Sequence, residues 1–313
     1  MTHLKYHLLL VVSTVLIAGS FISAQALSAD IAPAALALMR FGFAALILAP
    51  FIVFSKERRQ TFIRILPKGM IISFFYAAFF LIMFKALKTT STLNTGTLYT
   101  LVPFLTAVVS IFLFRDKIRP GTLLVYLIST LGTVWVIARG DINVLLRLTL
   151  NPGDALFLLG CLSMVGFSVA MKLLYKAEEM MVFVFTTLIS GAVWMAGALV
   201  LSGDVPDYSA MDAGKFLHMA YLAVGATLLT SWIIQKATVK LSPRQVSAYI
   251  YLNPVFVAFI AMLTSGQTLP ASIYPGIALS ILATVLLQVL AIKEQRRVKI
   301  TCAEGESVSR GVR

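Results

Sequence analysis

The chain has few of the side chains that metal sites and catalytic centres require. Its 313 residues include 2 cysteines and 3 histidines. Cys161 lies in an apolar run and Cys302 in a polar segment, so the cysteines indicate no disulfide framework. The histidines, His3, His7 and His218, form no metal-ligand cluster in the sequence. We therefore expect neither a metal nor any other cofactor.

Charged side chains are also scarce. They make up 12% of the chain, whereas a soluble domain usually has about 25%. Hydrophobic residues make up 59%, and the mean hydropathy is +0.92. These values predict an integral membrane protein. The sequence has no nucleotide-binding P-loop pattern, which argues against ATP-driven pumping by this chain alone.

Long apolar runs dominate the sequence. A membrane-spanning helix needs about 17–25 mostly apolar residues, and ten segments meet that length. The connections between them are too short to hold a soluble domain, and the polar residues 293–313 are predicted to form a disordered basic tail. The predicted spans are 8–26, 33–54, 69–87, 93–114, 122–138, 155–174, 180–201, 216–234, 246–264 and 273–292.

Lysine and arginine are distributed unevenly between the two ends of these spans. If the N-terminus is cytoplasmic, twenty of the 26 basic residues fall on the cytoplasmic side, five on the outer side, and Arg40 within a span. Cytoplasmic loops of membrane proteins carry an excess of Lys and Arg, so both termini are predicted to be cytoplasmic. The net charge of +13 then reflects orientation in the bilayer and requires no nucleic-acid partner.

Two proline-bearing segments indicate an internal repeat. LVPFLTAVVS at 101–110 returns as LNPVFVAFIA at 252–261, which aligns Pro103 with Pro254 at an offset of 151 residues. Five spans per half is an odd number, so the second half enters the membrane in the opposite sense. We predict an all-α membrane protein of ten transmembrane helices in two inverted five-helix repeats, at 1–150 and 151–292, with a substrate site near the midplane.

The first span also has features of a signal peptide. Lys5 precedes its apolar run, and Ala24-Gln25-Ala26 resembles an A-x-A cleavage site. Cleavage would leave nine spans and remove the opening helix of the first repeat. We therefore predict that this span is retained.

Several motifs, in their order and spacing, resemble the drug/metabolite transporter superfamily, EamA type. They are Arg40 within ALMRFGFAALIL, Ala86-Leu87 before the Thr/Ser-rich turn of ALKTTSTLNTG, and the two L-x-P segments. The resemblance covers residues 5 to 292. It implies carriage of small organic metabolites, often amino acids, across the bacterial inner membrane, frequently outward.

The chain departs from this family pattern in three places. The family often has Gly-Glu after the fourth and ninth spans, where this chain has Arg115-Asp116 and Gly266-Gln267. The tryptophan common in the first span of the family is absent. The implied fold does not depend on these residues, but the subfamily and the substrate do.

The two prolines predict kinks beside a central cavity. Proline removes a helical hydrogen bond, so Pro103 would free the carbonyl of Tyr99 and Pro254 that of Ile250. A freed carbonyl in a bilayer must face protein or a watery cavity. A packed kink is the alternative, but polar side chains gather at both prolines and favour the cavity. The candidate substrate-binding residues there are Asn94, Tyr99, Tyr249, Tyr251 and Asn253, and Pro103 and Pro254 are candidate gating residues.

Arg40 lies within the second predicted span, about 12 Å from its start at about 1.5 Å per residue. A charge at that depth is usually functional or paired. Arg40 either contacts an anionic group of the substrate or ties helices together, and the resemblance favours the structural role. In the third span, Tyr76 and Phe79 are candidates to stack on a substrate, and packing or lipid contact is the alternative.

His218 and Asp154 are the candidates for proton coupling, and a simpler role accounts for each. His218 lies near the outer end of the eighth span, as an interfacial histidine would. Asp154 begins the sixth span, where capping or a first-turn position explains an acidic residue. We therefore predict a facilitator or exchanger that moves substrate down its own gradient.

Three other classes of function fit the sequence less well. An intramembrane enzyme needs converging bases, acids or metal ligands. A channel would be expected to show a repeated filter or a charged ring, and a receptor an extramembrane domain. The leading hypothesis is a non-enzymatic secondary transporter that works by alternating access. Its predicted partners are a small-molecule substrate and the lipid bilayer, with no nucleic acid, and a monomer is the working expectation.

Overall fold

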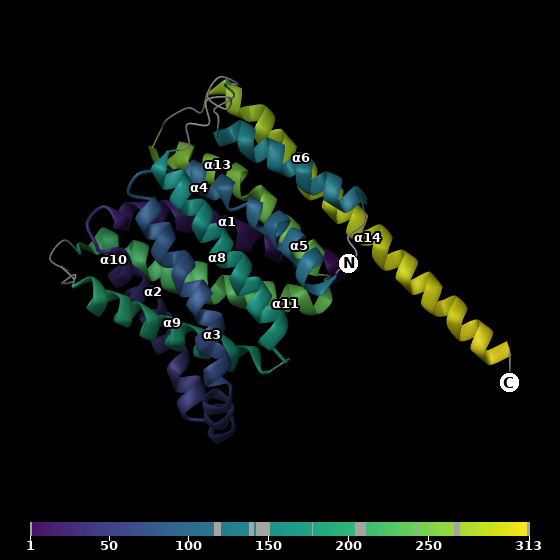
Figure 1. Ribbon diagram of the computed structural model, residues 1–313, viewed down its shortest axis with the longest axis horizontal. Helices are drawn as coiled ribbons and strands as arrows, with labels where there is room; N and C mark the ends of the chain where they lie inside the picture. The colour runs from purple at the N-terminus through teal and green to yellow at the C-terminus, as the bar shows by residue number, and fades with distance from the viewer. Residues whose placement is uncertain are drawn as a thin grey trace.

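The computed structural model describes residues 2–115, 120–137, 141, 151–176, 178–203, 211–241, 243–265 and 270–311, and the regular structure of this part of the chain is entirely helical (Figure 1). The first half contains α1 (Thr2–Ser28), α2 (Pro33–Val53), α3 (Lys56–Ala86), α4 (Thr92–Leu98), α5 (Leu101–Phe114) and α6 (Pro120–Ile137). The second half contains α8 (Pro152–Leu174), α9 (Met180–Ser202), α10 (Ala213–Ala220), the π-helix η1 (Tyr221–Leu229), α11 (Thr230–Lys240), α12 (Pro243–Ala248), the 3-10 helix η2 (Tyr249–Leu252), α13 (Asn253–Ser265), the 3-10 turn η3 (Ala271–Ile273) and α14 (Tyr274–Gly311).

Each of the ten predicted spans is mainly helical in its described residues, with turns at Phe54, Leu87, Tyr99 and Thr100. Nine helical segments of the described chain are long and apolar enough to cross a membrane, and α6 adds a shorter apolar stretch, Pro120–Gly132. Three spans are made of successive pieces: α4 with α5, α10 with η1 and α11, and α12 with η2 and α13. The chain is thus a multi-pass membrane protein.

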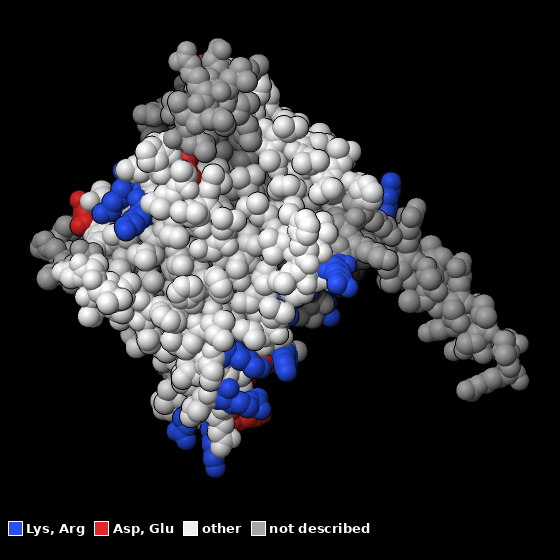
Figure 2. Space-filling model, viewed as in Figure 1, with Lys and Arg blue, Asp and Glu red and all other residues white. Residues whose placement is uncertain are grey.

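The surface has the character expected of a protein in a bilayer. Large apolar side chains such as Phe112, Val200 and Leu201 are exposed, which suits contact with lipid. Figure 2 shows Lys and Arg gathered at opposite margins of the molecule, with a broad face of uncharged side chains between them. This uncharged band is the part of the surface that a hydrocarbon core would cover.

Two boundaries differ from the prediction. Helix α3 begins at Lys56, well before residue 69, because the Ser55 hydroxyl caps its first turn by accepting from the backbone N–H of Arg58 at 3.4 Å. The prediction of a disordered tail is wrong for the backbone, since α14 continues to Gly311. Residues 293–304 contain neither glycine nor proline, so nothing in them breaks a helix. Asp116, Gly266 and Gln267, and the predicted repeat boundary at 150, lie outside the described residues.

The two prolines act on the backbone in the same way, but not as predicted. The chain tightens before each, and the N–H of Val102 donates to the carbonyl of Tyr99 at 3.1 Å. At the same offset of 151 residues, the N–H of Asn253 donates to the carbonyl of Ile250. The prediction that these two carbonyls are free is therefore wrong, because a 3-10 turn supplies a donor three residues later.

The packing of helices is symmetric under exchange of the two halves. Helices α2 and α9, and α6 and α14, are equivalent pairs, and the members of each pair contact one another; the equivalent fourth and ninth spans meet through α4 and α13. Contacts between different spans are also repeated in the two halves. Helix α3 packs on α8, and their counterparts do the same, since η1 and α11 (equivalent to α3) pack on α1 (equivalent to α8). Such reciprocal pairing is the signature of a two-fold axis, and five spans per half make the two repeats inverted.

Glycine allows one of these equivalent pairs to approach closely. A Cβ on Gly276 of α14 would lie 2.8 Å from the carbonyl oxygen of Gly132 on α6. A larger residue at either position would push the two helices apart, as expected of small residues at helix interfaces in membranes. Figure 1 shows α6 and α14 running side by side at the edge of the molecule.

Candidate functional site

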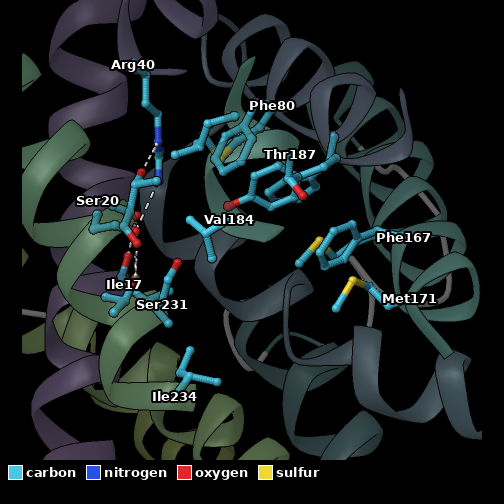
Figure 3. A pocket seen from close by; sticks show the side chains of 18 of the residues that line it. Ile17, Ser20, Arg40, Phe80, Phe167, Met171, Val184, Thr187, Ser231 and Ile234 are labelled. Atoms are coloured by element: carbon cyan, nitrogen blue, oxygen red, sulfur yellow. Dashed lines mark hydrogen bonds between the residues drawn. The ribbon is translucent and has the colours of Figure 1, made fainter. Parts of the chain in front are cut away.

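A cavity of about 740 Å³ lies between the two halves (Figure 3). Its volume falls within the range of about 300–1,000 Å³ that is typical of small-molecule sites. The first half contributes Ile17, Ser20, Phe21, Arg40, Tyr76, Phe79, Phe80, Met83 and Tyr99. The second half contributes Met164, Phe167, Met171, Lys172, Tyr175, Met180, Phe183, Val184, Thr187, Leu188, Ala226, Thr227, Thr230, Ser231 and Ile234.

Arg40 is the charged residue at the inner end of this cavity. Its side chain is 2% exposed, and its guanidinium reaches from α2 across to η1. Nε donates to the Thr227 hydroxyl at 2.9 Å, and one terminal nitrogen, Nη2, donates to the Ala226 carbonyl at 3.3 Å. The guanidinium carbon lies 4.1 Å from the centre of the Phe80 ring. The other terminal nitrogen, Nη1, has no hydrogen-bond partner among the described residues.

The π-helix explains how a helix can present acceptors to Arg40. In η1 the Thr227 hydroxyl donates to the carbonyl of Leu222 at 2.8 Å, five residues back, and the Thr230 hydroxyl donates to Ala226 at 2.9 Å. The wider turn shifts the register of the backbone carbonyls, so that Ala226 also accepts from Arg40. Short π-helical segments of this kind often occur at functional sites.

Aromatic and methionine side chains form most of the remaining wall. Tyr76 stacks on Phe41 with ring centres 5.7 Å apart and lies 4.9 Å from the ring of Phe167. Figure 3 shows Arg40 and Ser20 on one side of the space and Phe167 and Met171 on the other. Such walls are broad, apolar and adaptable, because the thioether of methionine adjusts its shape easily.

One end of the cavity reaches the membrane-surface ends of α8, α9 and α11. Lys172, Tyr175 and Met180 line it there. The mouth is tied to α3 by an ion pair between Lys68 and Glu178 at 3.1 Å, and the Tyr175 hydroxyl donates to the Glu178 carbonyl at 3.0 Å. Burial, followed by the charge of Glu178, raises the pKa of Tyr175, which keeps this hydroxyl protonated.

At the other end of α8, a polar clamp joins the α3–α4 turn and the start of α4 to the first turn of α8. The carboxylate of Asp154 accepts from the Thr90 hydroxyl and from the Asn94 amide, the latter at 3.0 and 3.2 Å. Asn151 caps α8 through the N–H of Gly153 and donates to the Thr89 carbonyl at 2.6 Å. Asp154 therefore joins two elements, in addition to its favourable place at a helix N-terminus.

The fit of this clamp depends on glycine. A Cβ on Gly153 would lie 2.6 Å from the Thr89 hydroxyl oxygen and 2.9 Å from the Ala86 carbonyl oxygen. Without a side chain, α8 can sit directly against the end of α3.

The symmetric helices are thus packed asymmetrically. Helix α3 packs directly on α1 and α2. The counterpart of α3 is α11, and the counterparts of α1 and α2 are α8 and α9. Helix α11 does not pack closely on α8 or α9, and residues of all three line the cavity. The described lining of the cavity accordingly includes Lys172, Tyr175 and Met180 at the loop ends of α8 and α9, but none of the clamp residues at the other end of α8.

Comparison with known proteins identifies the family. The sequence model of the EamA-like transporter family matches residues 4–138 and, a second time, residues 151–289. The chain belongs to the EamA-like transporter family. The two matches coincide with the two halves that the helix contacts relate.

The chain is also similar to individual proteins. The uncharacterized transporter YyaM of Bacillus subtilis (strain 168) is 22% identical over 266 residues, which cover 83% of this chain and 86% of YyaM. A crystal structure of a protein superposes with a TM-score of 0.65 at 18% identity and covers 91% of this chain and 97% of that chain. At that identity the crystal structure supports the fold alone.

The structure separates the predicted site residues into two groups. Arg40, Tyr76, Phe79 and Tyr99 line the cavity of this EamA-like protein. The others do not line it: Asn94 belongs to the Asp154 clamp, and Tyr249 bonds to His7 at 2.7 Å on α1. Pro103, Pro254, Tyr251 and Asn253 also lie outside the lining, and Tyr251 belongs to a buried cluster with Tyr126 of α6 and Ala283 of α14.

Among the described residues, the His218 ring has a hydrogen-bond partner, whereas the Asn253 amide has none. Nδ1 of His218 lies 3.1 Å from the Ser23 hydroxyl and connects α10 to α1. Asn253 is fully buried, and its amide has no hydrogen-bond partner among the described residues. Neither residue lines the cavity.

Sequence reasoning missed most of the second-half wall. On α8 the lining residues Met164, Phe167, Met171 and Tyr175 recur at three- and four-residue intervals, which places them on one face of the helix. Hydroxyls follow the same spacing in Thr227, Thr230 and Ser231. This periodicity was visible in the sequence, but core and lipid-facing stripes have the same spacing.

Proposed function

We propose that this chain is a secondary transporter that carries a small organic metabolite across the bacterial inner (plasma) membrane by alternating access. The cavity is the substrate site. The observation that carries the proposal is the asymmetric packing of two equivalent halves. A transporter of this design exchanges the packing of one half for that of the other, which closes the open end and opens the closed one.

The orientation of the cavity follows from the basic residues. Its open end lies on the side of the α2–α3 turn, which carries Lys56, Arg58 and Arg59. The excess of Lys and Arg assigns this side, with both termini, to the cytoplasm. The structure is then an inward-open state, ready to receive a metabolite such as an amino acid from the cytoplasm, as an exporter or facilitator would.

The energy source in this proposal is the substrate gradient. Among the described residues, none of those that line the cavity is Asp, Glu or His. Proton-coupled carriers usually place such a group in the membrane pathway. The chain therefore works as a facilitator or exchanger.

A bulky residue in the cavity tests the proposal. Thr187 lines the cavity from α9, whereas Val193 on the same helix is 55% exposed on the outer surface. In proteoliposomes loaded with a metabolite mixture, Thr187→Trp should lower flux about tenfold or more, because the indole fills the space that a substrate needs. Val193→Trp is the matched control and should transport normally. Equal flux in both variants would contradict the assignment of the cavity.

A further inference from the structure

The charges around the cavity are unbalanced. Arg40 and Lys172 bring positive charge to its lining, and the described lining residues include no carboxylate. The acidic residues nearest the mouth are engaged elsewhere: Glu178 pairs with Lys68, and Glu179 pairs with Arg58 at 2.9 Å. Asp154 is held in the clamp at the other end of α8. The space itself therefore has a positive potential.

Arg40 provides the specific feature of this potential. Its Nε and Nη2 are bonded to η1, which fixes the plane of the guanidinium. Nη1 is buried and has no acceptor among the described residues, so a substrate in the cavity reaches it only when the side chains around Arg40 shift. This buried guanidinium lacks an acceptor for one donor and a counter-charge, and a buried charge normally has such a partner. A carboxylate supplies the acceptor and the counter-charge together.

The remaining side chains of the cavity wall indicate the chemical character of the rest of the substrate, beyond its carboxylate. Tyr76, Phe79, Phe80 and Phe167 offer ring surfaces, and Met164 and Met171 add flexible apolar surface. Four of the lining hydroxyls, those of Ser20, Thr187, Thr227 and Thr230, already donate to backbone carbonyls of their own spans, as Thr187 does to the Phe183 carbonyl at 3.0 Å. An apolar or aromatic body suits such a wall better than a sugar or another polar body.

An α-amino acid fits this site less well than the corresponding carboxylic acid without the amino group. Its ammonium is on the carbon next to the carboxylate, so binding the carboxylate at Arg40 brings the ammonium close to the same guanidinium. Like charges at short distance repel, more strongly where water is excluded. The described lining has no carboxylate to compensate, and the Phe80 face nearest to Arg40 is already occupied by the guanidinium.

We infer that the cavity selects substrates that carry a single negative charge on an aromatic or apolar body, in preference to zwitterionic amino acids. This inference rests on the proposed function, because it names the substrate class of the same site. It assigns Arg40 as the residue that binds the carboxylate.

Four matched probes test the inference on the purified full chain: 3-phenylpropionate, phenylalanine, phenethylamine and 3-phenylpropan-1-ol. They share a phenyl body of similar length and differ in charge. By calorimetry, 3-phenylpropionate should bind about tenfold or more tightly than any of the other three, since it alone offers Arg40 a carboxylate without an ammonium beside it. Equal or tighter binding of phenylalanine, or no binding of 3-phenylpropionate, would overturn the inference. This ranking needs no variant and so does not depend on folding of a mutant.

Variants then test whether Arg40 is the residue responsible for the preference for 3-phenylpropionate. Arg40→Gln should remove the preference for 3-phenylpropionate over 3-phenylpropan-1-ol, and Arg40→Lys should retain part of it. Arg58→Gln, which removes a cation outside the cavity lining, is the matched control and should leave the ranking unchanged. A preference that survives in folded Arg40→Gln protein overturns the role of Arg40.

Flux measurements keep the two proposals apart. Proteoliposomes that transport phenylalanine but not 3-phenylpropionate, with loss in Thr187→Trp, would support a transporter and overturn the substrate class. Probes that bind in the inferred order but never cross the membrane would support the substrate class and contradict the transport function.

Discussion

At the scale of the residue, Glu178 shows how one side chain holds the mouth of the cavity. Burial alone would raise its pKa, but hydrogen bonds from the backbone N–H of Lys176 and from the Lys68 ammonium outweigh burial and lower the pKa of Glu178 below its usual value. A lowered pKa in the folded state adds stability at a pH above the unfolded value, and this stability is lost as the pH falls through the folded value. We expect Glu178→Gln to lower thermal stability at pH 7, by at most about 1 kcal/mol because solvent screens the pair.

Thermal unfolding in detergent between pH 7 and pH 3 measures this effect. The difference between wild type and Glu178→Gln should be constant down to about pH 5 and shrink below the ordinary glutamate pKa of about 4.3. Lys68→Gln removes the other half of the pair and should reduce the same pH-dependent term. A difference between wild type and Glu178→Gln that does not vary with pH would show that the ion pair adds nothing to stability.

At the scale of the element, the α3–α4 turn is held to α8 by Asp154. Replacing Asp154 with alanine leaves the Thr90 hydroxyl and the Asn94 amide without their acceptor, which costs about 1–3 kcal/mol. The clamp should then open more often. Backbone amides of residues 88–95 should exchange with deuterium about five- to a hundredfold faster in Asp154→Ala.

The conservative variant separates charge from hydrogen bonding. Asp154→Asn keeps one acceptor oxygen at the same place and should exchange at an intermediate rate. Amides near residues 175 to 180, at the open end, serve as the internal reference. If exchange in the α3–α4 turn is the same in Asp154→Ala and wild type, other contacts hold this turn to α8.

At the scale of the whole molecule, the inverted repeat fixes where each loop must lie. An even number of spans brings both termini to one side, and the excess of Lys and Arg predicts that this side is the cytoplasmic one. Reporter fusions at residues 60, 145, 208 and 300 should report inside, outside, outside and inside. A reporter at 300 that is active on the outer side would contradict both the ten-span topology and the inward-open assignment of the cavity.

The sequence by itself determined the helical spans and their division into two related halves. This is because a chain in lipid must satisfy its backbone hydrogen bonds within each span, so span length and apolar composition are readable locally. It also named Arg40, Tyr76, Phe79 and Tyr99 among the candidate substrate-binding residues; these four line the cavity, and their role in binding stays a prediction.

Only the tertiary structure decided which of two equivalent surfaces became a cavity. Tyr251 resembles Tyr99 in chemistry and lies near the equivalent proline, yet it packs against Tyr126 and Ala283. The sequence repeat is nearly symmetric, but the packing is not: α3 closes on α1 and α2, while α11 stands apart from α8 and α9. Which half is closed depends on small differences in packing energy between two similar arrangements, and these arise from contacts between helices far apart in the chain.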